Sequence, residues 1–516
     1  MSSVLGFLVE PATGTSVALE VVQWILVGLV LLGAVPMVST VYQFLLLLRT
    51  PRHDHYQDCD PDFLPRVVVL VPAWNEIAVL RYSVDAMMAL DYPPERLRMA
   101  VVDDGSTDGT PELLDGKVSQ YPGRVLNLRR ENGGQGKAHT LNHGLTLLLE
   151  DDWADAVLIT DADVVFEPTS VRRMVRHLAD ERVGAVTAFI LEASKRPNTM
   201  NRYIGYEYTA AQAASRRAQN VVGAQGCLAG GAQLHSRANL LELGGAIDTT
   251  TLAEDTVTTF ETQLAGRAVV FDGNARCLAE EPGSVVGLWK QRLRWSRGNI
   301  QVAKRFGGVT GGVFFGRSDV HRLGGLWFGL QWFTTLLLPV LMIISSTSLV
   351  ILWFISFGKA EIAFEILWVT NAFGWLFTTI YTLSLDRWVA RRTWFQAFTF
   401  PGLVNIVIIV AALAPRPTRE LRDWALDRLG MTWSAGLADT LTLFAYAWVA
   451  LCMVAAWGLY RLEKAGRLPK VQSVLLVLIG YGPLLCAITF AAYVAEARGA
   501  AIKWEKTEKT GAVGPA

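Results

Sequence analysis

Long stretches without a charged residue restrict the fold of this 516-residue chain more than any other feature. Each is about 20 residues or longer, the length of a helix that crosses a hydrocarbon core of about 30 Å. One buried core helix can also lack charges, but six such runs in one chain do not fit a soluble protein. We therefore expect an integral membrane protein. The runs cover residues 21–48, 323–358, 366–385, 393–415, 440–460 and 471–495.

The composition excludes several other classes of protein. Hydrophobic residues make up 51% of the chain and charged residues 18%, against about 25% charged in an ordinary soluble domain. A disordered chain, a coiled coil and a small disulfide scaffold are therefore excluded. The 47 basic and 47 acidic residues cancel, so we expect no nucleic-acid partner. The cysteines are dispersed without a Cys-x-x-Cys pair and are expected to be reduced packing residues: Cys59, Cys227, Cys277, Cys452 and Cys486.

The middle of the chain, from about residue 61 to residue 305, has a different pattern. Short apolar runs alternate there with amphipathic stretches, which predicts a parallel sheet with helices on both faces. In such sheets the ligand binds beyond the carboxyl ends of the strands. The predicted strands are residues 66–71, 99–102, 125–128, 156–160 and 183–189, and the predicted helices include residues 77–90, 138–149 and 170–179.

Basic residues next to the uncharged runs predict the orientation in the membrane, because they favour the cytosolic side. Arg49, Arg52 and Arg322 place the middle region in the cytosol and the N-terminus outside. We expect about five spans, with the run 393–415, broken at Pro401-Gly402, lying along the interface. One conflict remains, because this arrangement leaves four basic residues outside: Arg461, Lys464, Arg467 and Lys470.

Three acidic motifs follow predicted strands. They are PAWNE at residues 72–76, DDGSTDG at residues 103–109 and TDAD at residues 160–163. Asp, Ser and Gly are also ordinary turn residues, so a capped turn is the alternative for each motif. In an Asp-x-Asp segment on extended chain, both carboxylates point to one side, because side chains alternate. Two oxygen ligands that face one way suit Mg²⁺ or Mn²⁺ bound to a diphosphate.

Further motifs lie at predicted helices. NGGQGK at residues 132–137 is rich in glycine but lacks the spacing of the phosphate-binding loop. His139 and His143 stand one helical turn apart, yet no third zinc ligand is evident. The segment Ala253-Glu254-Asp255 opens a helix, where acidic residues are favourable in any case. QRLRW at residues 291–295 lies in an amphipathic helix over about residues 284–306, which suits a membrane surface.

These motifs together resemble the family 2 processive glycosyltransferases, which include cellulose, chitin, hyaluronan and poly-N-acetylglucosamine synthases. PAWNE, VVDDGSTDG, GKAHTLN, TDAD, AED and QRLRW occur in that order ahead of a membrane bundle. The resemblance covers about residues 61–310. It implies an α/β nucleotide-diphosphate-sugar-binding domain of the GT-A type on the cytosolic face, followed by an α-helical transmembrane bundle that forms a channel for the polymer.

The resemblance also implies roles for particular residues. Asp255 would be the general base, with Glu254 beside it at the substrate. Asp161 and Asp163 would hold Mg²⁺ or Mn²⁺, with Asp163 the more direct ligand. The nucleotide pocket would include Asn75, Glu76, Asp103, Asp104 and Lys137, with Asp161 at the donor. The diphosphate and the acceptor end would be bound by Gln291, Arg294 and Trp295.

The expected activity is inverting transfer from a UDP-sugar to the end of a growing β-linked polysaccharide, which is then extruded across the plasma membrane. The expected partners are this donor, a polysaccharide or lipid-linked acceptor, membrane lipids and accessory export proteins. One alternative is transfer of a single sugar to a lipid-linked acceptor, and another is a transporter with a nucleotide-sensing domain. Ala253 departs from the usual Thr of the family, and residues 226–237 match the acceptor-site segment only loosely.

The expected division of the chain follows from these assignments. Residues 1–50 form an N-terminal transmembrane helix and residues 61–283 the cytosolic glycosyltransferase domain. Residues 284–321 form interfacial amphipathic helices. Residues 322–496 form the C-terminal transmembrane bundle with one interfacial segment, and residues 497–516 a cytosolic tail. Within that tail, residues 504–507 (WEKT) resemble a motif of relatives.

Overall fold

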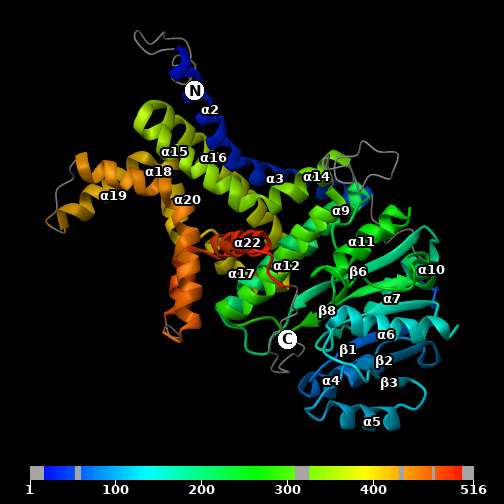
Figure 1. Cartoon of the computed structure of the whole chain (residues 1–516). Helices are drawn as coiled ribbons and strands as arrows, with labels where there is room; N and C mark the ends of the chain where they lie inside the picture. Colours follow the sequence, from blue (N-terminus) through cyan, green and yellow to red (C-terminus); the bar gives the residue numbers. More distant parts are fainter. Residues whose placement is uncertain are drawn as a thin grey trace.

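The computed structural model describes residues 17–52, 60–307, 325–428, 430, 435–467 and 471–501. An α/β part lies at one end of the molecule and a group of long helices at the other (Figure 1). Several features singled out above lie outside the described residues: Cys59, residues 308–321 of the interfacial segment, Arg322, Lys470 and the motif at residues 504–507.

The α/β part is built on one sheet. Its strand order is β3-β2-β1-β4-β7-β6-β8-β5 among the described residues. All five predicted strands are present, each within a few residues of its expected bounds. The strands are β1 Val67–Ala73, β2 Leu97–Asp103, β3 Val125–Arg129, β4 Ala156–Ile159, β5 Val165–Phe166, β6 Val183–Glu192, β7 Gln233–Ser236 and β8 Ala268–Ala279.

The prediction of a parallel sheet is correct for all five predicted strands and for β8, whereas β7 and β5, which were not predicted, run in the opposite direction. β3, β2, β1 and β4 are parallel, whereas β7 runs antiparallel to both of its neighbours, β4 and β6. β5 is also antiparallel to β8. The sequence gives little sign of β7, because its four residues include Gln233, His235 and Ser236 and form no apolar run. His235 is fully buried all the same and contacts Gln233 and Asn239 through its ring nitrogens.

Strand β1 shows why the central strands are apolar throughout. Val67, Val69 and Val71 pack into the large core on one face. Val68 and Leu70 pack into a second core on the other face, which α6 (Lys137–Glu150) covers. A strand buried on both faces needs apolar side chains at every position. α6 approaches closely at Gly144, where a Cβ atom would lie 2.5 Å from Leu70 Cδ1.

The remaining helices of the α/β part flank the sheet or lead away from it. The predicted helices at residues 77–90, 138–149 and 170–179 are confirmed as α4, α6, and α7 with the following 3-10 turn. The elements are α4 Ile77–Met88, η3 Pro94–Arg96, α5 Thr110–Gln120, α7 Ser170–Val175, η4 Arg176–Ala179, α8 Thr199–Tyr208, the π-helical segment η5 Thr209–Ala214, α9 Ser215–Val222, α10 Arg237–Glu242, α11 Glu254–Leu264 and α12 Val285–Gly307.

The helical part contains the candidate membrane spans. Within the described residues, four helices are long and apolar enough to cross a membrane, or six if each of two bent pairs counts as one span. The elements are α2 Val17–Leu31, η1 Leu32–Ala34, α3 Val35–Leu46, η2 Leu47–Arg52, α14 Gly325–Leu336, α15 Leu338–Ile355, α16 Phe357–Leu385, α17 Arg387–Thr399, α18 Leu403–Leu413, α19 Pro415–Arg428, α20 Ala435–Lys464, α21 Gln472–Ile479 and α22 Tyr481–Ala497.

The two bent pairs meet at their breaks. α17 and α18 are bent by 70°, and α21 and α22 by 87°. The first break lies at the expected Pro401-Gly402, whereas the run 471–495, expected as one span, is divided at Gly480. Gly402 and Gly480 have φ angles of +97° and +102°, a region that favours glycine. Their backbones are in such close contact that a Cβ atom on Gly480 would clash with the Pro401 carbonyl oxygen.

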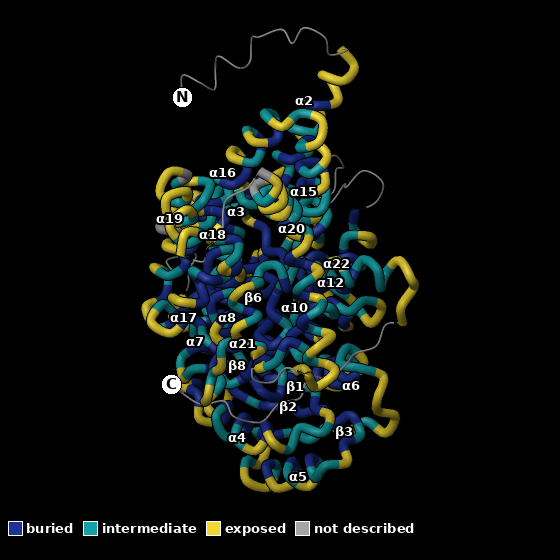
Figure 2. Tube along the Cα trace, turned by 90° about the vertical axis from the view of Figure 1, so that its left-hand side faces the viewer, coloured by how far each residue is buried: buried dark blue, intermediate teal, exposed yellow. Residues whose placement is uncertain are grey.

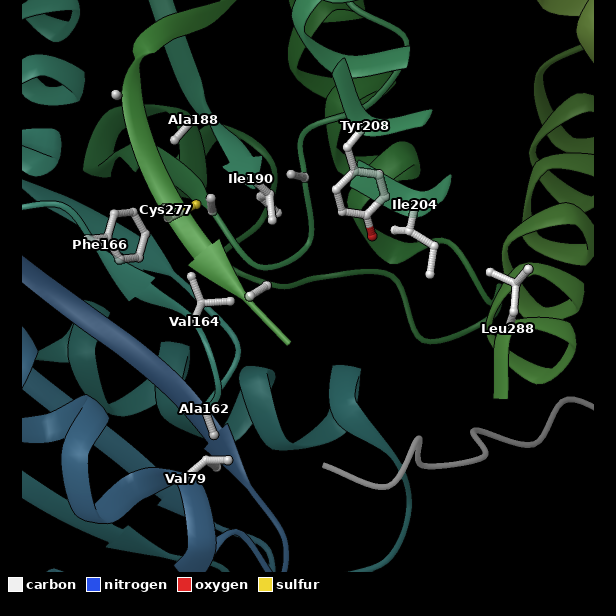
Figure 3. Packing of buried hydrophobic residues seen from close by; sticks show 14 of the residues in the cluster. Val79, Ala162, Val164, Phe166, Ala188, Ile190, Ile204, Tyr208, Cys277 and Leu288 are labelled. Carbon is white, nitrogen blue, oxygen red and sulfur yellow. The ribbon is translucent and has the colours of Figure 1, made fainter. Parts of the chain in front are cut away.

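The α12 helix joins the two parts of the molecule. The core that contains Cys277 of β8 continues through Ile204 and Tyr208 of α8 to Leu288 of α12 (Figure 3). On its other side, α12 packs against α20 and α22, and the Trp289 ring stacks on Tyr460 at 4.2 Å. Burial is accordingly continuous from β1 and β2 through α12, while α2 and α19 are largely exposed (Figure 2).

Candidate active site

A cavity of about 1180 Å³ lies where the carboxyl ends of β1 and β4 face α12. Its lining includes most of the residues that the sequence motifs singled out. Asn75 and Asp103 are not part of this lining; Asn75 lies in the turn after β1, and Asp103 is the last residue of β2. The lining includes these motif residues: Trp74, Glu76, Asp104, Lys137, Asp161, Asp163, Glu254, Asp255, Gln291, Arg294 and Trp295.

The turns after β1 and β2 are tied to each other. Asn75 has a φ of +54°, and Asn tolerates this left-handed conformation better than most residues. Its backbone N–H donates to Ser106 Oγ at 2.8 Å, and its side-chain oxygen accepts from the Thr107 N–H at 2.8 Å. The Glu76 N–H donates to Thr110 Oγ1 at 3.1 Å. These bonds hold Trp74 and Glu76 at the cavity wall.

The two adjacent aspartates at the end of β2 have different surroundings. Asp103 is fully buried and accepts a 3.0 Å hydrogen bond from the Ser106 N–H, so it shapes the turn. Asp104 forms an ion pair with Arg130 and accepts from the Gly134 N–H at 2.9 Å. Asp104 therefore connects the acidic turn to the glycine-rich loop. The sequence analysis did not single out Arg130, which no motif marked.

Lys137 lies at the centre of an acidic cluster. Its Nζ is 2.7 Å from Asp161 Oδ1 and 3.5 Å from Glu254 Oε1. Burial opposes the charge on Lys137, but Asp161 and Glu254 outweigh burial and raise the pKa of Lys137, so it remains protonated. The structure thus brings together three motifs that span more than a hundred residues of sequence.

Asp255 lies beside this cluster in the first turn of α11. Burial and the neighbouring Glu254 raise its pKa to about 6, and Lys137 opposes this rise. Its Oδ1 accepts a 2.7 Å hydrogen bond from the Thr256 N–H. The loop opposite passes very close, since a Cβ atom on Gly230 would lie 3.0 Å from Asp255 Oδ2. Glycine at this position leaves the carboxylate facing the cavity.

Asp161 and Asp163 follow β4 and both line the cavity. Asp161 has a side-chain exposure of 41%, whereas Asp163 is 8% exposed. Gly231 lies against Asp161, because a Cβ atom on this glycine would be 3.2 Å from Asp161 Oδ2. Within the described ranges, no group of three or more His, Cys, Asp or Glu residues has the geometry of a metal site. A cation bound by these two carboxylates would complete its shell with oxygen ligands from water or a substrate.

The QRLRW segment lies on α12 at the other wall of the cavity. Gln291 is buried and donates from Nε2 to Glu281 Oε2 at 3.0 Å. Trp295 is 37% exposed, and the Arg292 guanidinium lies 4.0 Å from its ring centroid. Arg294 also lines the cavity. Glu281 was not singled out in the sequence, because it lies between elements in a segment without a motif.

The cavity continues from the α/β part into the helical part. Its far lining contains uncharged hydrogen-bonding side chains together with aromatic rings, which is an unusual surface for helices of such apolar composition. Polar contributions come from α3, α14, α16 and α22: Thr40, Gln43, Gln331, Thr335, Thr378, Thr382 and Thr489. Aromatic contributions include Trp332, Trp375 and Phe400.

Comparisons with known proteins agree with the motifs. The family described as "Glycosyltransferase like family 2" matches residues 65–298. A probable glycosyltransferase, YdaM, of Bacillus subtilis is 31% identical over 47% of this chain and 57% of its own length. A poly-beta-1,6-N-acetyl-D-glucosamine synthase of Staphylococcus aureus is 27% identical over 48% of this chain and 58% of its own length. This chain therefore matches little more than half the length of either relative.

Among solved structures, a mannosyltransferase from Pyrobaculum calidifontis in complex with GDP-Man and Mn²⁺ is similar, with 23% identity and a TM-score of 0.48. It covers 75% of this chain and 100% of its own length. The family match and the sheet with its flanking helices confirm the expected fold class, an α/β domain of the GT-A type accompanied by apolar helices. Over residues 65–298, the chain is thus similar to the domain of glycosyltransferase family 2.

Proposed function

We propose that this protein transfers a sugar from a UDP-sugar to the end of a β-linked polysaccharide at the cytosolic face of the plasma membrane. The observation that carries the proposal is one cavity that contains Asp255, Lys137, the Asp161–Asp163 pair and the QRLRW segment and that continues among the apolar helices. The relative from Staphylococcus aureus is named a poly-N-acetylglucosamine synthase, so N-acetylglucosamine is the first donor sugar to test.

Asp255 is the proposed general base. An acceptor hydroxyl is a weak nucleophile, and a carboxylate within about 3 Å must take its proton as it attacks the anomeric carbon. A pKa of about 6 makes Asp255 a stronger proton acceptor than an ordinary aspartate, while it remains ionised at neutral pH. Direct displacement of this kind inverts the anomeric centre, so an α-linked donor gives a β-linked product.

The leaving diphosphate carries the charge that the site must stabilise. Arg294 lines the cavity, and its planar guanidinium fits phosphate oxygens. Asp161 and Asp163 provide hard oxygen ligands that fit Mg²⁺ or Mn²⁺, with diphosphate oxygens completing the shell. Such an ion would neutralise charge on the leaving group. Lys137 holds Asp161 in place and adds a positive charge beside it.

Trp295 and Gln291 are proposed to hold the acceptor end. An exposed indole face with one N–H donor suits a sugar ring. Asn75, Glu76, Asp103 and Asp104 are proposed to form and support the nucleotide pocket, in the turns after β1 and β2. The hydrogen bonds between these turns support this assignment, because they fix the wall on which Glu76 and Asp104 lie.

We also propose the chain division that the sequence predicted, with a refined orientation of the spans. Gln23 of α2 is bonded to Lys359 at 2.6 Å near the turn between α15 and α16, away from the α/β domain. The other end of α16 lies beside that domain, since Asp386 is paired with Arg276 of β8 at 2.8 Å. The N-terminal side of α2 and the α15–α16 turn are then outside.

α20 supports a change to the expected topology. Its Tyr446 ring lies 4.7 Å from Phe364, near the outer end of α16, whereas Tyr460 stacks on Trp289 of α12. α20 therefore runs from the outside toward the α/β domain. This places Arg461, Lys464 and Arg467 on the cytosolic side, in agreement with the positive-inside rule. The bent pair α17–α18 then carries the chain outward, which leaves Arg416, Arg419 and Arg422 of α19 outside, against the same rule. Five crossings result if α21–α22 lies along the interface.

The test incubates purified protein with UDP-N-acetylglucosamine, UDP-glucose or other UDP-sugars, with Mg²⁺, Mn²⁺ or EDTA, and measures UDP release and product length. A long polymer that forms only with a divalent cation is the expected result. One added sugar on a lipid acceptor would replace the proposal by the non-processive alternative. No UDP release with any donor would contradict both.

Asp255→Asn tests the base directly. Transfer should fall by at least about 10²–10⁴-fold, the usual contribution of a positioned base. Binding of UDP-sugar should remain nearly intact, because the amide has the same shape and the nucleotide turns are elsewhere. Titration calorimetry with the donor and a UDP-release assay measure the two effects separately. Wild-type turnover in this variant would remove Asp255 from the mechanism.

A further inference from the structure

A chain of buried polar contacts connects the QRLRW segment to the bent helix pair α21–α22. We propose that Glu207 of α8 and Tyr481 of α22 are positioning residues, which hold Arg292 and thereby set the orientation of Gln291 and Trp295. The inference rests on the proposed function only in taking Gln291 and Trp295 as substrate-binding residues. Neither Glu207 nor Tyr481 belongs to any of the sequence motifs.

Arg292 is the link between the substrate-facing residues and the rest of the chain. It is only 5% exposed, and its Nη1 donates to Gln291 Oε1 at 2.7 Å. Its guanidinium also lies 4.0 Å from the centroid of the Trp295 ring, a cation–π contact that orients the ring. Gln291 and Trp295, which both line the cavity, are therefore in contact with one buried cation.

Glu207 compensates the charge of Arg292. Arg292 Nη2 donates to Glu207 Oε2 at 2.8 Å, with both side chains at most 15% exposed. The Tyr481 hydroxyl donates to the same carboxylate oxygen at 2.5 Å. A buried cation that loses its paired carboxylate is strongly destabilised and moves or admits water. The position of Arg292 thus depends on Glu207, and that of Glu207 on Tyr481.

Tyr481 is fixed by the crossing of the two helix breaks. It follows Gly480 directly, and the close contact between Gly480 and Pro401 determines where α22 begins. The Tyr481 ring stacks on Tyr203 at 5.3 Å with an interplanar angle of 9°. It also lies 5.4 Å from Phe400. These ring contacts hold the Tyr481 hydroxyl in place beside Glu207. The helical part therefore contributes directly to the geometry of the cavity wall that contains Gln291 and Trp295.

The first experiment compares Glu207→Gln and Tyr481→Phe with wild-type protein in transfer from UDP-N-acetylglucosamine to N-acetylglucosamine oligosaccharides. Loss of positioning should raise the KM for the acceptor about tenfold or more in Glu207→Gln and less in Tyr481→Phe, because phenylalanine keeps the ring contacts. The two changes should not add when combined, since both act on the same carboxylate. The KM for the donor should change little.

Matched controls separate positioning from general stability. Tyr493→Phe makes the same change on the same helix, where the hydroxyl donates to the Leu336 carbonyl at 3.0 Å. Glu242→Gln removes a carboxylate paired with Arg267 on the surface. Both controls should keep the wild-type acceptor KM. If Glu207→Gln and Tyr481→Phe only reduced the fraction of folded protein, the apparent kcat would fall and the acceptor KM would stay unchanged. That result would overturn the proposal.

A second measurement does not depend on the proposed activity. Hydrogen–deuterium exchange of peptides from α12 reports local opening. Exchange around Gln291–Trp295 should be faster in Glu207→Gln and Tyr481→Phe than in the two controls, while exchange in β1 and β2 stays unchanged. Unchanged exchange in α12 would overturn the positioning role even in an active enzyme. If the wild-type protein lacked transferase activity, the proposed function would be contradicted. The exchange measurement would still test the positioning role.

Discussion

Asp255 shows how the site adjusts one side chain through its neighbours. Burial and Glu254 favour its protonated form, and Lys137 favours its ionised form. The three groups come from the starts of two helices, α6 and α11, that meet at the cavity wall. The balance between them sets the pH range in which Asp255 can accept a proton.

The first prediction concerns that pH range. Only ionised Asp255 can act as a base, so at saturating donor the transfer rate should rise with pH through about 6 and then level off. Lys137→Met removes the charge that lowers the pKa of Asp255, so this rise should shift to higher pH. Lys117→Met, at a distant pair with Asp85, is the control and should leave the profile unchanged. A profile that does not move in Lys137→Met would contradict the assigned coupling.

Gly230 gives a second prediction at this scale. In Gly230→Ala the new methyl group would lie 3.0 Å from Asp255 Oδ2 and 3.4 Å from Lys137 Nζ. Transfer should fall, because the Asp255 carboxylate must move away from the methyl group, but by less than the roughly 10²-fold that a displacement of about 1 Å causes. Gly116→Ala places its methyl group in open space and should keep full activity. UDP-release kinetics alongside thermal unfolding will show whether the loss is local to the site.

Among the elements, the bent helix pairs depend on tertiary contact more than on local sequence. The Pro401-Gly402 break is visible in the sequence, because proline and glycine end helices. The helices are bent by a similar angle at Gly480. The sequence does not predict this break, because one glycine in an apolar run is usually tolerated within a helix. Contact between the two backbones makes glycine necessary at both positions.

The prediction for this element is that Gly480→Ala destabilises the fold. Alanine at a φ of +102° is strained by about 1–3 kcal/mol. The clash with the Pro401 carbonyl adds to this cost, because backbone atoms cannot rotate away. The detergent-solubilised variant should unfold at a lower temperature than wild type. Gly458→Ala on α20, with nothing within 4 Å of the added methyl, should unfold as wild type does, and equal stability of both variants would refute the close crossing.

For the whole molecule, the decisive feature is the joint between the α/β domain and the apolar helices. α12 contacts both, and the cavity extends across the same joint. Under the proposed function, a polar product formed at Asp255 would enter a space lined by hydroxyl, amide and aromatic groups. The proposed orientation of the spans follows from which helix ends lie beside the α/β domain.

Cysteine labelling tests this orientation. In a variant without native cysteines, Ser356→Cys at the α15–α16 turn should react with a membrane-impermeant maleimide on intact cells. Arg467→Cys, just beyond α20, should react only after the membrane is permeabilised, because the end of α20 lies beside α12. Labelling of Arg467→Cys on intact cells would show that the basic residues at the end of α20 lie outside. It would contradict the five-span arrangement.

The sequence by itself determined the class of the fold, most central strands and the identity of the candidate site. Apolar runs and strand-end motifs are local signals, and they located Asp161, whereas Lys137 and Asp255 were assigned through the family resemblance. Only the tertiary structure decided that β7 runs antiparallel, that Lys137 meets Glu254, and that Arg292 depends on Glu207 and Tyr481. These features depend on contacts between segments far apart in the chain, for which a single sequence contains no periodic or compositional signal.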